Sequence, residues 1–327
     1  MYYEPYRKPG SSRRRNRRRK SCLGIIAVFF AKLLALALVL SLVTAGVLLV
    51  LPVSLFAVER GTDLSLATDL PVSPLNVLVL GVDTLDKGTQ RSDTMMIATI
   101  GPATLKLTSL QRDTKVQIPG KGSAKLNAAY AYGGAELAMR TVNETFDTNI
   151  MHYIVVDFTA LVKMVDALGG IDVDITQEEM DHINGNVMYS GRVFGALGYT
   201  FTELKEYGKN THLNGLQALG YARIRKLDSD FMRTSRQRIV IGEMLEKLKV
   251  SLWNPLAVVG FLKAALESVQ TDLSTLQLIS LGEKALLAGG LEQMRLPVDG
   301  SFEDDGSSLS ITDRGKNVSE FRKFVYG

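Results

Sequence analysis

The chain has 327 residues, of which 46% are hydrophobic, 7% aromatic and 22% charged. These values are typical of a globular protein and exclude a wholly disordered, collagen-like or multi-spanning chain. The net charge of +4 conceals two unlike parts: residues 1–32 hold ten basic residues and one acidic residue, and the remainder holds 28 basic and 33 acidic residues. The acidic main part argues against nucleic acid as a partner, because its binding depends on clustered lysine and arginine. The single cysteine, Cys22, excludes an intramolecular disulfide and a metal site built from several cysteines.

Residues 23–58 form an apolar run that predicts a membrane anchor. Within it, residues 33–51 are 19 consecutive residues without a charge, and a helix of that length at about 1.5 Å per residue crosses the apolar core of a bilayer once. Nine basic residues lie within residues 7–20, whereas the flank after the run, 59–69, holds one arginine and three acidic residues. The positive-inside rule therefore places the basic tail, residues 1–22, in the cytoplasm and everything beyond the anchor outside.

A cleaved signal peptide is the alternative, because it also joins a basic start to an apolar stretch. The run is too long for the apolar region of a signal peptide, and Pro52-Val53-Ser54 is a poor cleavage site. We therefore expect an uncleaved signal anchor in a single-pass protein of the cell membrane. The basic tail is expected to bind anionic membrane lipid rather than nucleic acid.

Beyond the anchor, strands and helices are predicted in alternation. Residues 59–74 are polar and contain two prolines, which predicts a short stalk. Strands are predicted at 75–82, 93–100, 105–110, 153–158 and 171–175. Helices are predicted at 126–146, with an interruption or cap at Gly133-Gly134, and at 159–168, 214–223, 235–250, 256–269 and 273–287. The glycine-rich stretch within 181–211 predicts loops or an irregular hairpin. The alternation predicts a layered α/β domain at 75–250, followed by a helical C-terminal portion at 251–327.

Aspartate and arginine residues gather at the ends of the predicted strands. Asp83 follows the first strand, Arg91 and Asp93 open the second, and Arg112 and Asp113 follow the third. Ligands of open α/β sheets bind beyond the carboxyl ends of strands, where Asp83 and Arg112 are expected. The phosphate-loop, nucleophile-elbow and His-Glu-x-x-His patterns do not occur in the chain.

Further along, Arg223 and Arg225 have the spacing of one strand face, so both point at one ligand if the segment is extended, and diverge if it is helical. Arg233 and Gln237 share one face of a helix. Arginine pairs bidentately with phosphate oxygens, and carboxylates hold the magnesium that bridges them. The pattern is therefore typical of a phosphate site, and an ordinary network of surface and interdomain salt bridges is the alternative.

Six motifs in the same order along residues 75–245 resemble the LytR-CpsA-Psr (LCP) family. They are Asn76-Val77-Leu78-Val79-Leu80-Gly81-Val82-Asp83, Arg91-Ser92-Asp93-Thr94-Met95-Met96, Ser109-Leu110-Gln111-Arg112-Asp113-Thr114, Lys125-Leu126-Asn127-Ala128-Ala129-Tyr130-Ala131-Tyr132-Gly133-Gly134, Val165-Asp166-Ala167-Leu168-Gly169-Gly170, and Ala222-Arg223-Ile224-Arg225-Lys226 with Arg236-Gln237. A short basic tail and one signal anchor are also usual in that family. The resemblance implies an LCP-like layered mixed β-sheet flanked by helices in a catalytic domain at 75–250.

The resemblance also implies a magnesium-dependent phosphotransferase outside the membrane. It would move a glycopolymer, of teichoic acid or capsule type, from a polyprenyl diphosphate carrier to peptidoglycan. Asp83 and Asp93 would bind Mg²⁺ against the diphosphate, Asp93 is the first candidate for the proton acceptor, and Asp113 is either the second candidate or a residue that holds Arg112 in place. The diphosphate oxygens would be bound by Arg91, Arg112, Arg223, Arg225, Arg233 and Gln237. Gln111 departs from the family, which often has a small residue or proline there, but it carries no charged role.

The prenyl chain requires an apolar groove, because leaving it in water is costly. Apolar residues that could line such a groove, or else belong to the core, are Ile154, Val156, Phe158, Leu161 and Val165. A hydrolase that uses water as the acceptor needs the same residues and is the nearest competing function. A module that captures the polymer without chemistry, or a membrane-bound regulator, would also be compatible with the sequence.

Overall fold

The computed structural model describes residues 63–71, 73–83, 91–101, 104–195, 198–200, 202–225 and 227–327. The predicted basic tail and membrane anchor, residues 1–58, lie outside the described residues. The helices within the described part are all too short or too polar to cross a membrane.

A mixed six-stranded sheet forms the centre of the described part, in the order β10-β3-β2-β1-β6-β9. Its strands are β1 Leu75–Val82, β2 Ser92–Ile100, β3 Leu105–Leu110, β6 His152–Asp157, β9 Val269–Thr271 and β10 Leu291–Leu296. The pairs β1-β2, β2-β3 and β6-β9 are antiparallel, and β1-β6 and β3-β10 are parallel. The carboxyl ends of β1, β3, β6 and β10 therefore share one edge with the start of β2, and we call this the site edge.

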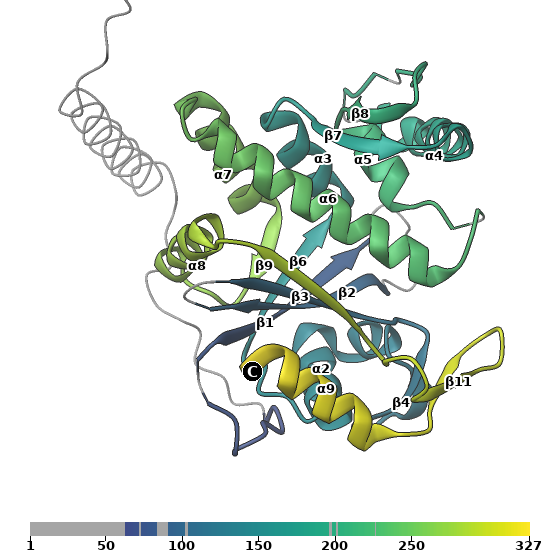
Figure 1. Ribbon diagram of the computed structural model, residues 1–327, viewed down its shortest axis with the longest axis vertical. Coiled ribbons are helices and arrows are strands. Elements are labelled where there is room, and N and C mark those ends of the chain that lie inside the picture. The colour runs from purple at the N-terminus through teal and green to yellow at the C-terminus, as the bar shows by residue number, and fades with distance from the viewer. Residues whose placement is uncertain are drawn as a thin grey trace, which may run out of the picture. The chain divides into compact units, whose positions relative to one another are not determined.

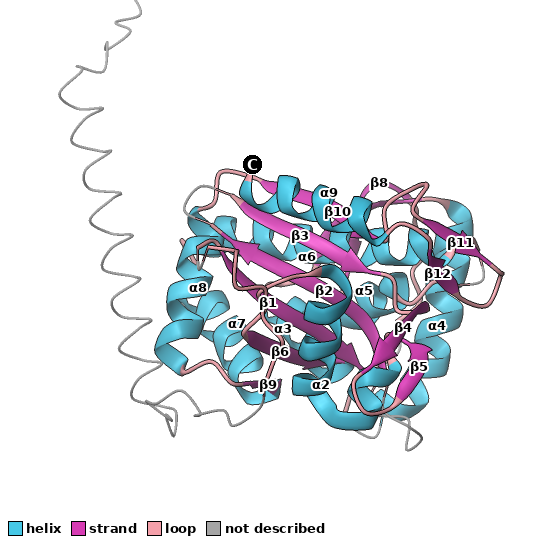
Figure 2. Ribbon diagram, turned by 90° about the horizontal axis from the view of Figure 1, so that it is seen from below, coloured by secondary structure: helices cyan, strands magenta, loops and turns pink. Residues whose placement is uncertain are grey.

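Helices cover both faces of this sheet (Figures 1 and 2). One face packs on α2 Ala128–Phe146 and α9 Arg314–Tyr326, and the other faces α3 Phe158–Ala167, α5 Gly215–Ala222, α6 Asp230–Ser251, α7 Pro255–Ser268 and α8 Thr275–Leu287. The main core lies on the α2 side, where Leu78 and Leu80 of β1 meet Met139 and Phe146 of α2 and Phe321 of α9. Successive residues of a strand point to opposite faces, so the residues between these, such as Val79 and Gly81, face the other helix layer.

Two small sheets flank the centre. One, in the order β11-β12-β4-β5, extends from the site edge, and the other pairs β7 with β8 beside α4 Gln177–Gly195. Their strands are β4 Thr114–Ile118, β5 Gly122–Lys125, β7 Ile171–Ile175, β8 Gly208–Leu213, β11 Phe302–Asp304 and β12 Leu309–Ile311.

The structure confirms the predicted α/β fold, a mixed sheet flanked by helices, and it corrects two local predictions. The first part of the stretch predicted as loops or a hairpin, residues 181–195, belongs to helix α4, which buries Ile183, Val187 and Phe194. Thr176 and Glu179 form reciprocal side-chain to backbone bonds at its start, a helix signal that the glycines farther along obscure in the sequence pattern. Residues 251–327, predicted as helical, also supply β9 to β12, and β9 and β10 form the two edges of the central sheet.

Candidate active site

An apolar cavity of about 330 Å³ lies between the central sheet and the helices α3, α5 and α6. It extends from Asp93 at the start of β2 to Ile100 at its end, a length of about 23 Å at roughly 3.3 Å per residue. Its lining on the sheet side includes Val79, Met96, Ala98, Leu107, Ile154 and Val156, and on the helix side Phe158, Leu161, Met164, Leu219, Val240, Met244 and Leu248. Four of the five residues suggested for a prenyl groove are thus among the lining residues. The fifth, Val165, is fully buried and is not one of them.

Polar side chains border the cavity at the site edge. Asp93, Arg223, Arg225, Arg233 and Gln237 line this mouth. Asp93 lies between two arginines, since its Oδ1 accepts from Arg112 Nη1 at 2.5 Å and its Oδ2 lies 2.9 Å from Arg225 Nη2. The Asp93 side chain keeps 27% exposure, so it is open to a ligand from the solvent side.

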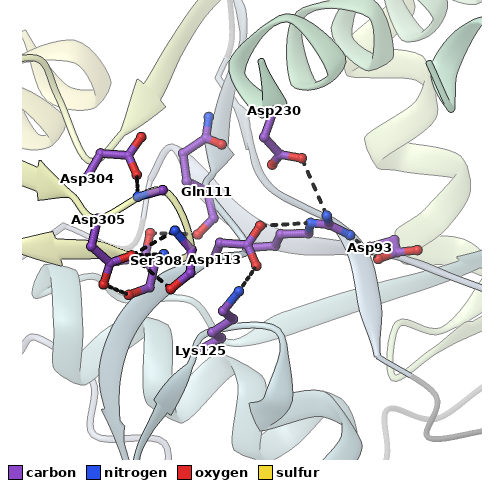
Figure 3. A network of polar contacts seen from close by, with 12 residues as sticks. Asp93, Gln111, Asp113, Lys125, Asp230, Asp304, Asp305 and Ser308 are labelled. Atoms are coloured by element: carbon purple, nitrogen blue, oxygen red, sulfur yellow. Dashed lines mark hydrogen bonds and ion pairs between the residues drawn. The ribbon is translucent and has the colours of Figure 1, made fainter. Parts of the chain in front are cut away.

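Arg112 connects three carboxylates, those of Asp93, Asp113 and Asp230, which are labelled in Figure 3. Besides Asp93, its Nε lies 3.4 Å from Asp113 Oδ2 and its Nη2 lies 3.5 Å from Asp230 Oδ1. Asp113 is also paired with Lys125, Nζ to Oδ1, at 2.9 Å. Asp113 therefore contacts both Arg112 and Lys125 and is not among the residues that line the cavity.

Arg233 is the most buried charged residue of the described site, with 1% of its surface exposed. Its guanidinium pairs with Asp230 at 2.9 Å and donates to the backbone carbonyl of Asp93 at 3.2 Å. Burial lowers the pKa of Arg233 to about 10, the Asp230 carboxylate opposes this shift, and the positive charges of Arg112 and Arg225 add to it. An anion at the mouth would relieve this concentration of positive charge.

Arg223 and Arg225 reach the site from a turn instead of a strand. Arg223 caps the end of α5, with φ −101° and ψ 2°, and Arg225 follows two residues later. Arg223 lies 3.4 Å from Asp83 and stacks its guanidinium 4.7 Å from the ring centre of Phe158. Arg223 ends a helix, so the extended alternative does not describe this pair, and both side chains nevertheless reach the site edge.

The other predicted site residues occupy distinct places. Gln237 lies one turn beyond Arg233 on α6, and its buried Oε1 has no hydrogen-bond partner among the described residues. Arg91 is exposed directly before β2. Gln111 is buried and donates to Thr234 Oγ1 of α6 at 3.3 Å, so it joins β3 to the helix layer without entering the mouth.

Asp230 and Lys125 belong to the charged network although the sequence pattern predicts no role for them. Asp230 is the first residue of α6, and it pairs with Arg233 one turn later and with Arg112 from β3. The i, i+3 spacing of Asp230 and Arg233 was a usable signal, because such pairs face each other on a helix. Lys125 comes close to Asp113 through the β4-β5 hairpin, which the sequence analysis did not predict.

The fit of a magnesium ion depends on Asp83 and Asp93. Within the described ranges, histidine, cysteine and carboxylate side chains do not form a group of three that could hold a metal by themselves. Magnesium is commonly held by only one or two carboxylates together with substrate phosphates, and these two partly exposed aspartates of the site edge suit that mode. The residues present therefore fit a magnesium ion that binds together with a phosphate ligand.

A long apolar cavity that ends in arginines and aspartates defines a class of protein that binds an amphiphile with an apolar tail and an anionic head. The LytR_cpsA_psr family model matches residues 58–323, and the chain belongs to this family. The chain is 38% identical over 250 residues to the polyisoprenyl-teichoic acid–peptidoglycan teichoic acid transferase TagU of Enterococcus faecalis, covering 73% of this chain and 75% of that protein. It is 33% identical to the protein of the same name from Bacillus mycoides, covering 71% of this chain and 72% of that protein.

Among solved structures, the chain resembles TagT bound to LIIa-WTA, with a TM-score of 0.62 and 25% identity. The match covers 83% of this chain and 97% of that one. The family model itself extends to residue 323, past the predicted end of the catalytic domain at 250.

Proposed function

We propose that this protein is a phosphotransferase that moves a glycopolymer of teichoic acid or capsule type from a polyprenyl diphosphate carrier to peptidoglycan. The observation that carries the proposal is the cavity, which joins an apolar space about 23 Å long to a mouth with Asp93 and three arginines. The Enterococcus faecalis relative is named for the same donor class and acceptor. We place the catalytic domain outside the membrane, after the single anchor predicted at 23–58.

The donor would bind with its prenyl chain in the cavity and its diphosphate at the mouth. The apolar lining removes the chain from water, which is the main favourable term for such a ligand. Arg223, Arg225 and Arg233 come from α5, the following turn and α6, and they approach the mouth from different directions. Such an array suits a diphosphate, whose oxygens also point in several directions. Arg91 and Gln237 would supply further donors at its edge.

The reaction would be an attack by a hydroxyl group of the glycan on the phosphorus atom that carries the polymer. The new oxygen–phosphorus bond forms while the bond from that phosphorus to the bridging oxygen breaks, and polyprenyl phosphate leaves. Asp93 accepts the hydroxyl proton, and Arg112 and Arg233 neutralise charge that develops on the phosphate oxygens. A magnesium ion held by Asp83 and Asp93 would supply further neutralisation of the diphosphate charge. Asp113 keeps Arg112 in position.

The test uses the full chain reconstituted in lipid vesicles with Mg²⁺, a polyprenyl diphosphate-linked sugar and a glycan acceptor. Products are identified by mass. We expect phosphosugar attached to the glycan with wild type, and at least about a hundredfold less with Asp93→Asn, because a proton acceptor contributes about that much. Asp181→Asn, a change of the same kind at an exposed position of α4, is the matched control and should leave the rate unchanged.

The competing functions give different products in the same assay. Free phosphosugar in the presence of acceptor would identify a hydrolase. Donor binding without turnover, unaffected by Asp93→Asn, would identify a capture module and contradict the catalytic assignment. Loss of transfer on chelation and its return with Mg²⁺ would support the metal assignment, and full activity in chelator would contradict it.

A further inference from the structure

The end of the cavity opposite the charged mouth lies where three helices meet. Leu248 of α6, Phe261 of α7 and Ala285 of α8 line it there, together with Ile100 and Leu105 at the turn between β2 and β3. This far end belongs to the edge of the sheet opposite the site edge, because β2 ends and β3 begins there.

Large apolar side chains are exposed around this far end. Val250 lies in the last turn of α6, Trp253 follows that helix, Leu256 lies in the first turn of α7, and Leu287 ends α8. Their exposed fractions are 72%, 59%, 84% and 78%. Helix α6 contacts both α7 and α8. We call Val250, Trp253, Leu256 and Leu287 the apolar rim. Exposed apolar groups gathered in this way mark an interaction surface.

The chain enters the domain at this same edge of the sheet. Leu75, the first residue of β1, is paired with Ile100, so the strand begins beside the far end of the cavity. The segment before it is tied to the domain: Asn143 Nδ2 donates to the carbonyl of Leu64 at 2.9 Å, and Ala67 N donates to that of Thr148 at 3.0 Å. The fixed part of the chain therefore begins by residue 64, close to the predicted anchor.

The tether between the anchor and this fixed part is short. Only residues 59–62 separate the end of the apolar run at 58 from Asp63. Fully extended, this stretch spans about 18 Å, and the whole of residues 52–62 after the crossing segment 33–51 spans about 40 Å. The tether holds the domain near the bilayer, and the chain enters the domain at the edge that carries the apolar rim. The rim is therefore within reach of the membrane surface.

We infer that the apolar rim docks on the outer surface of the lipid bilayer and opens the far end of the cavity to it. Leucine and valine gain by leaving water, and tryptophan favours the interface between headgroups and acyl chains. Charges of both signs lie nearby, since Lys249 pairs with Glu246 at 2.7 Å. The contact between the apolar rim and the bilayer therefore depends on apolar burial and not on net charge. A prenyl chain longer than the cavity would then emerge into lipid instead of water. The docking itself does not depend on whether the bound ligand is transferred.

The single tryptophan of the chain makes the inference directly measurable, because Trp253 is a member of the apolar rim. The full chain is reconstituted in zwitterionic vesicles that contain lipids brominated near the headgroup end of the acyl chains. We expect a blue-shifted Trp253 emission that falls by roughly half on bromination, as for an indole at the interface. The matched control is Trp253→Phe with Tyr207→Trp, since Tyr207 is 54% exposed and precedes β8, away from the rim; its emission should not be quenched.

Unquenched, solvent-exposed Trp253 emission would overturn the inference. Blue-shifted emission that depends on protein density but not on bromination would show that a second copy of the chain covers the rim, and would overturn it as well. The variant Leu256→Ser/Leu287→Ser is the second check, and both positions are exposed, so folding should be preserved. We expect transfer from a vesicle-embedded donor to fall about tenfold, the loss expected for one to two buried methylene groups, with no change for a short detergent-soluble donor. Equal loss with both donors would contradict the membrane contact while leaving the proposed transfer intact.

Discussion

Each guanidinium nitrogen of Arg112 lies within 3.5 Å of a different carboxylate, and the planar fork of arginine reaches all three at once. Replacing it by lysine keeps the charge but allows only one such contact at a time. We expect Arg112→Lys to lower the transfer rate by about a hundredfold, because a donor aimed at the developing phosphate charge is lost. The unfolding free energy should change by less than about 1 kcal/mol, since Asp93 keeps Arg225 and Asp113 keeps Lys125.

Arg322 offers a matched control for this substitution. It also pairs with two carboxylates, those of Asp69 and Asp147, but it lies on α9 on the other side of the sheet. Arg322→Lys should leave the transfer rate within about twofold of wild type, as surface substitutions away from a site do. The assay is steady-state transfer together with urea unfolding. A similar rate for Arg112→Lys and wild type would remove Arg112 from the reaction.

Gln237 tests whether the mouth is built for an anion. A carboxylate at this position would stand close to the diphosphate, so we expect Gln237→Glu to raise the KM for the donor about tenfold, in line with the cost of adding a like charge near an anion. Gln237→Met is the matched neutral variant and should have a much smaller effect. If both variants raise KM equally, the loss comes from shape and not from charge.

The sequence predicts the charged residues of the site where they lie at the ends of strands that it also predicts. Asp83, Asp93 and Arg112 are fixed to the site edge by strands whose apolar pattern is plain in the sequence. Asp230 and Lys125 come together with them only when α6 packs on the sheet and the β4-β5 hairpin closes. These are long-range contacts, and a local pattern carries little information about them.

Helix α2 contains a break that only glycine permits without strain. Gly134 has φ +67°, in the left-handed region, whereas Gly185 lies in the interior of α4 with open space where a Cβ would stand. We expect Gly134→Ala to lower the unfolding free energy by about 1–2 kcal/mol. Gly185→Ala should raise it by about 0.5–1 kcal/mol, because alanine loses less backbone entropy in a helix. Urea unfolding of both variants measures the two changes in unfolding free energy. Changes of the same sign would contradict the difference in backbone conformation between the two glycines.

A substitution in strand β2 tests whether the cavity holds the prenyl chain. Ala98 points into it from the middle of the strand, while its neighbours Ile97 and Thr99 are buried on the opposite face. A phenylalanine at 98 would occupy space meant for the prenyl chain. We expect Ala98→Phe to raise the KM for a long-chain donor about tenfold, equivalent to one to two methylene groups no longer buried. A short-chain donor measured with the same variant is the control, and equal effects on both donors would mean that the mouth itself is distorted.

The elements that the sequence predicted well carry a plain local signal, such as the apolar run of β1 and the apolar face of α3. The missed strands are short or polar. Strand β10 reads Leu-Glu-Gln-Met-Arg-Leu and pairs with β3, whose sequence position is nearly two hundred residues earlier. Its strand character depends on that partner, so no window of the sequence around residues 291–296 contains the signal.

At the scale of the whole molecule, the last 77 residues, 251–327, share one sheet and one core with the part that carries the site. Strand β10 extends the sheet beside β3, and β9 extends it beside β6. Phe321 and Val325 of α9 are buried in the core on α2, and Tyr326 donates to Asn149 at 3.0 Å. Arg322 and Asp69 join α9 to the segment that leads from the predicted anchor. The two ends of the described chain thus stabilise one another across a shared core.

This arrangement predicts that residues 59–327 unfold in one transition and that residues 59–250 alone do not fold. The shorter chain would leave both sheet edges unpaired and would expose the apolar surface that α9 covers, at a cost of several kcal/mol, comparable to the total stability of a domain. The check is urea unfolding of residues 59–327 followed by Trp253 emission and far-ultraviolet circular dichroism. Coincident midpoints are expected, because Trp253 reports on the C-terminal part and dichroism on the whole. Separate midpoints, or a cooperative transition of residues 59–250, would instead show that the catalytic part ends near residue 250.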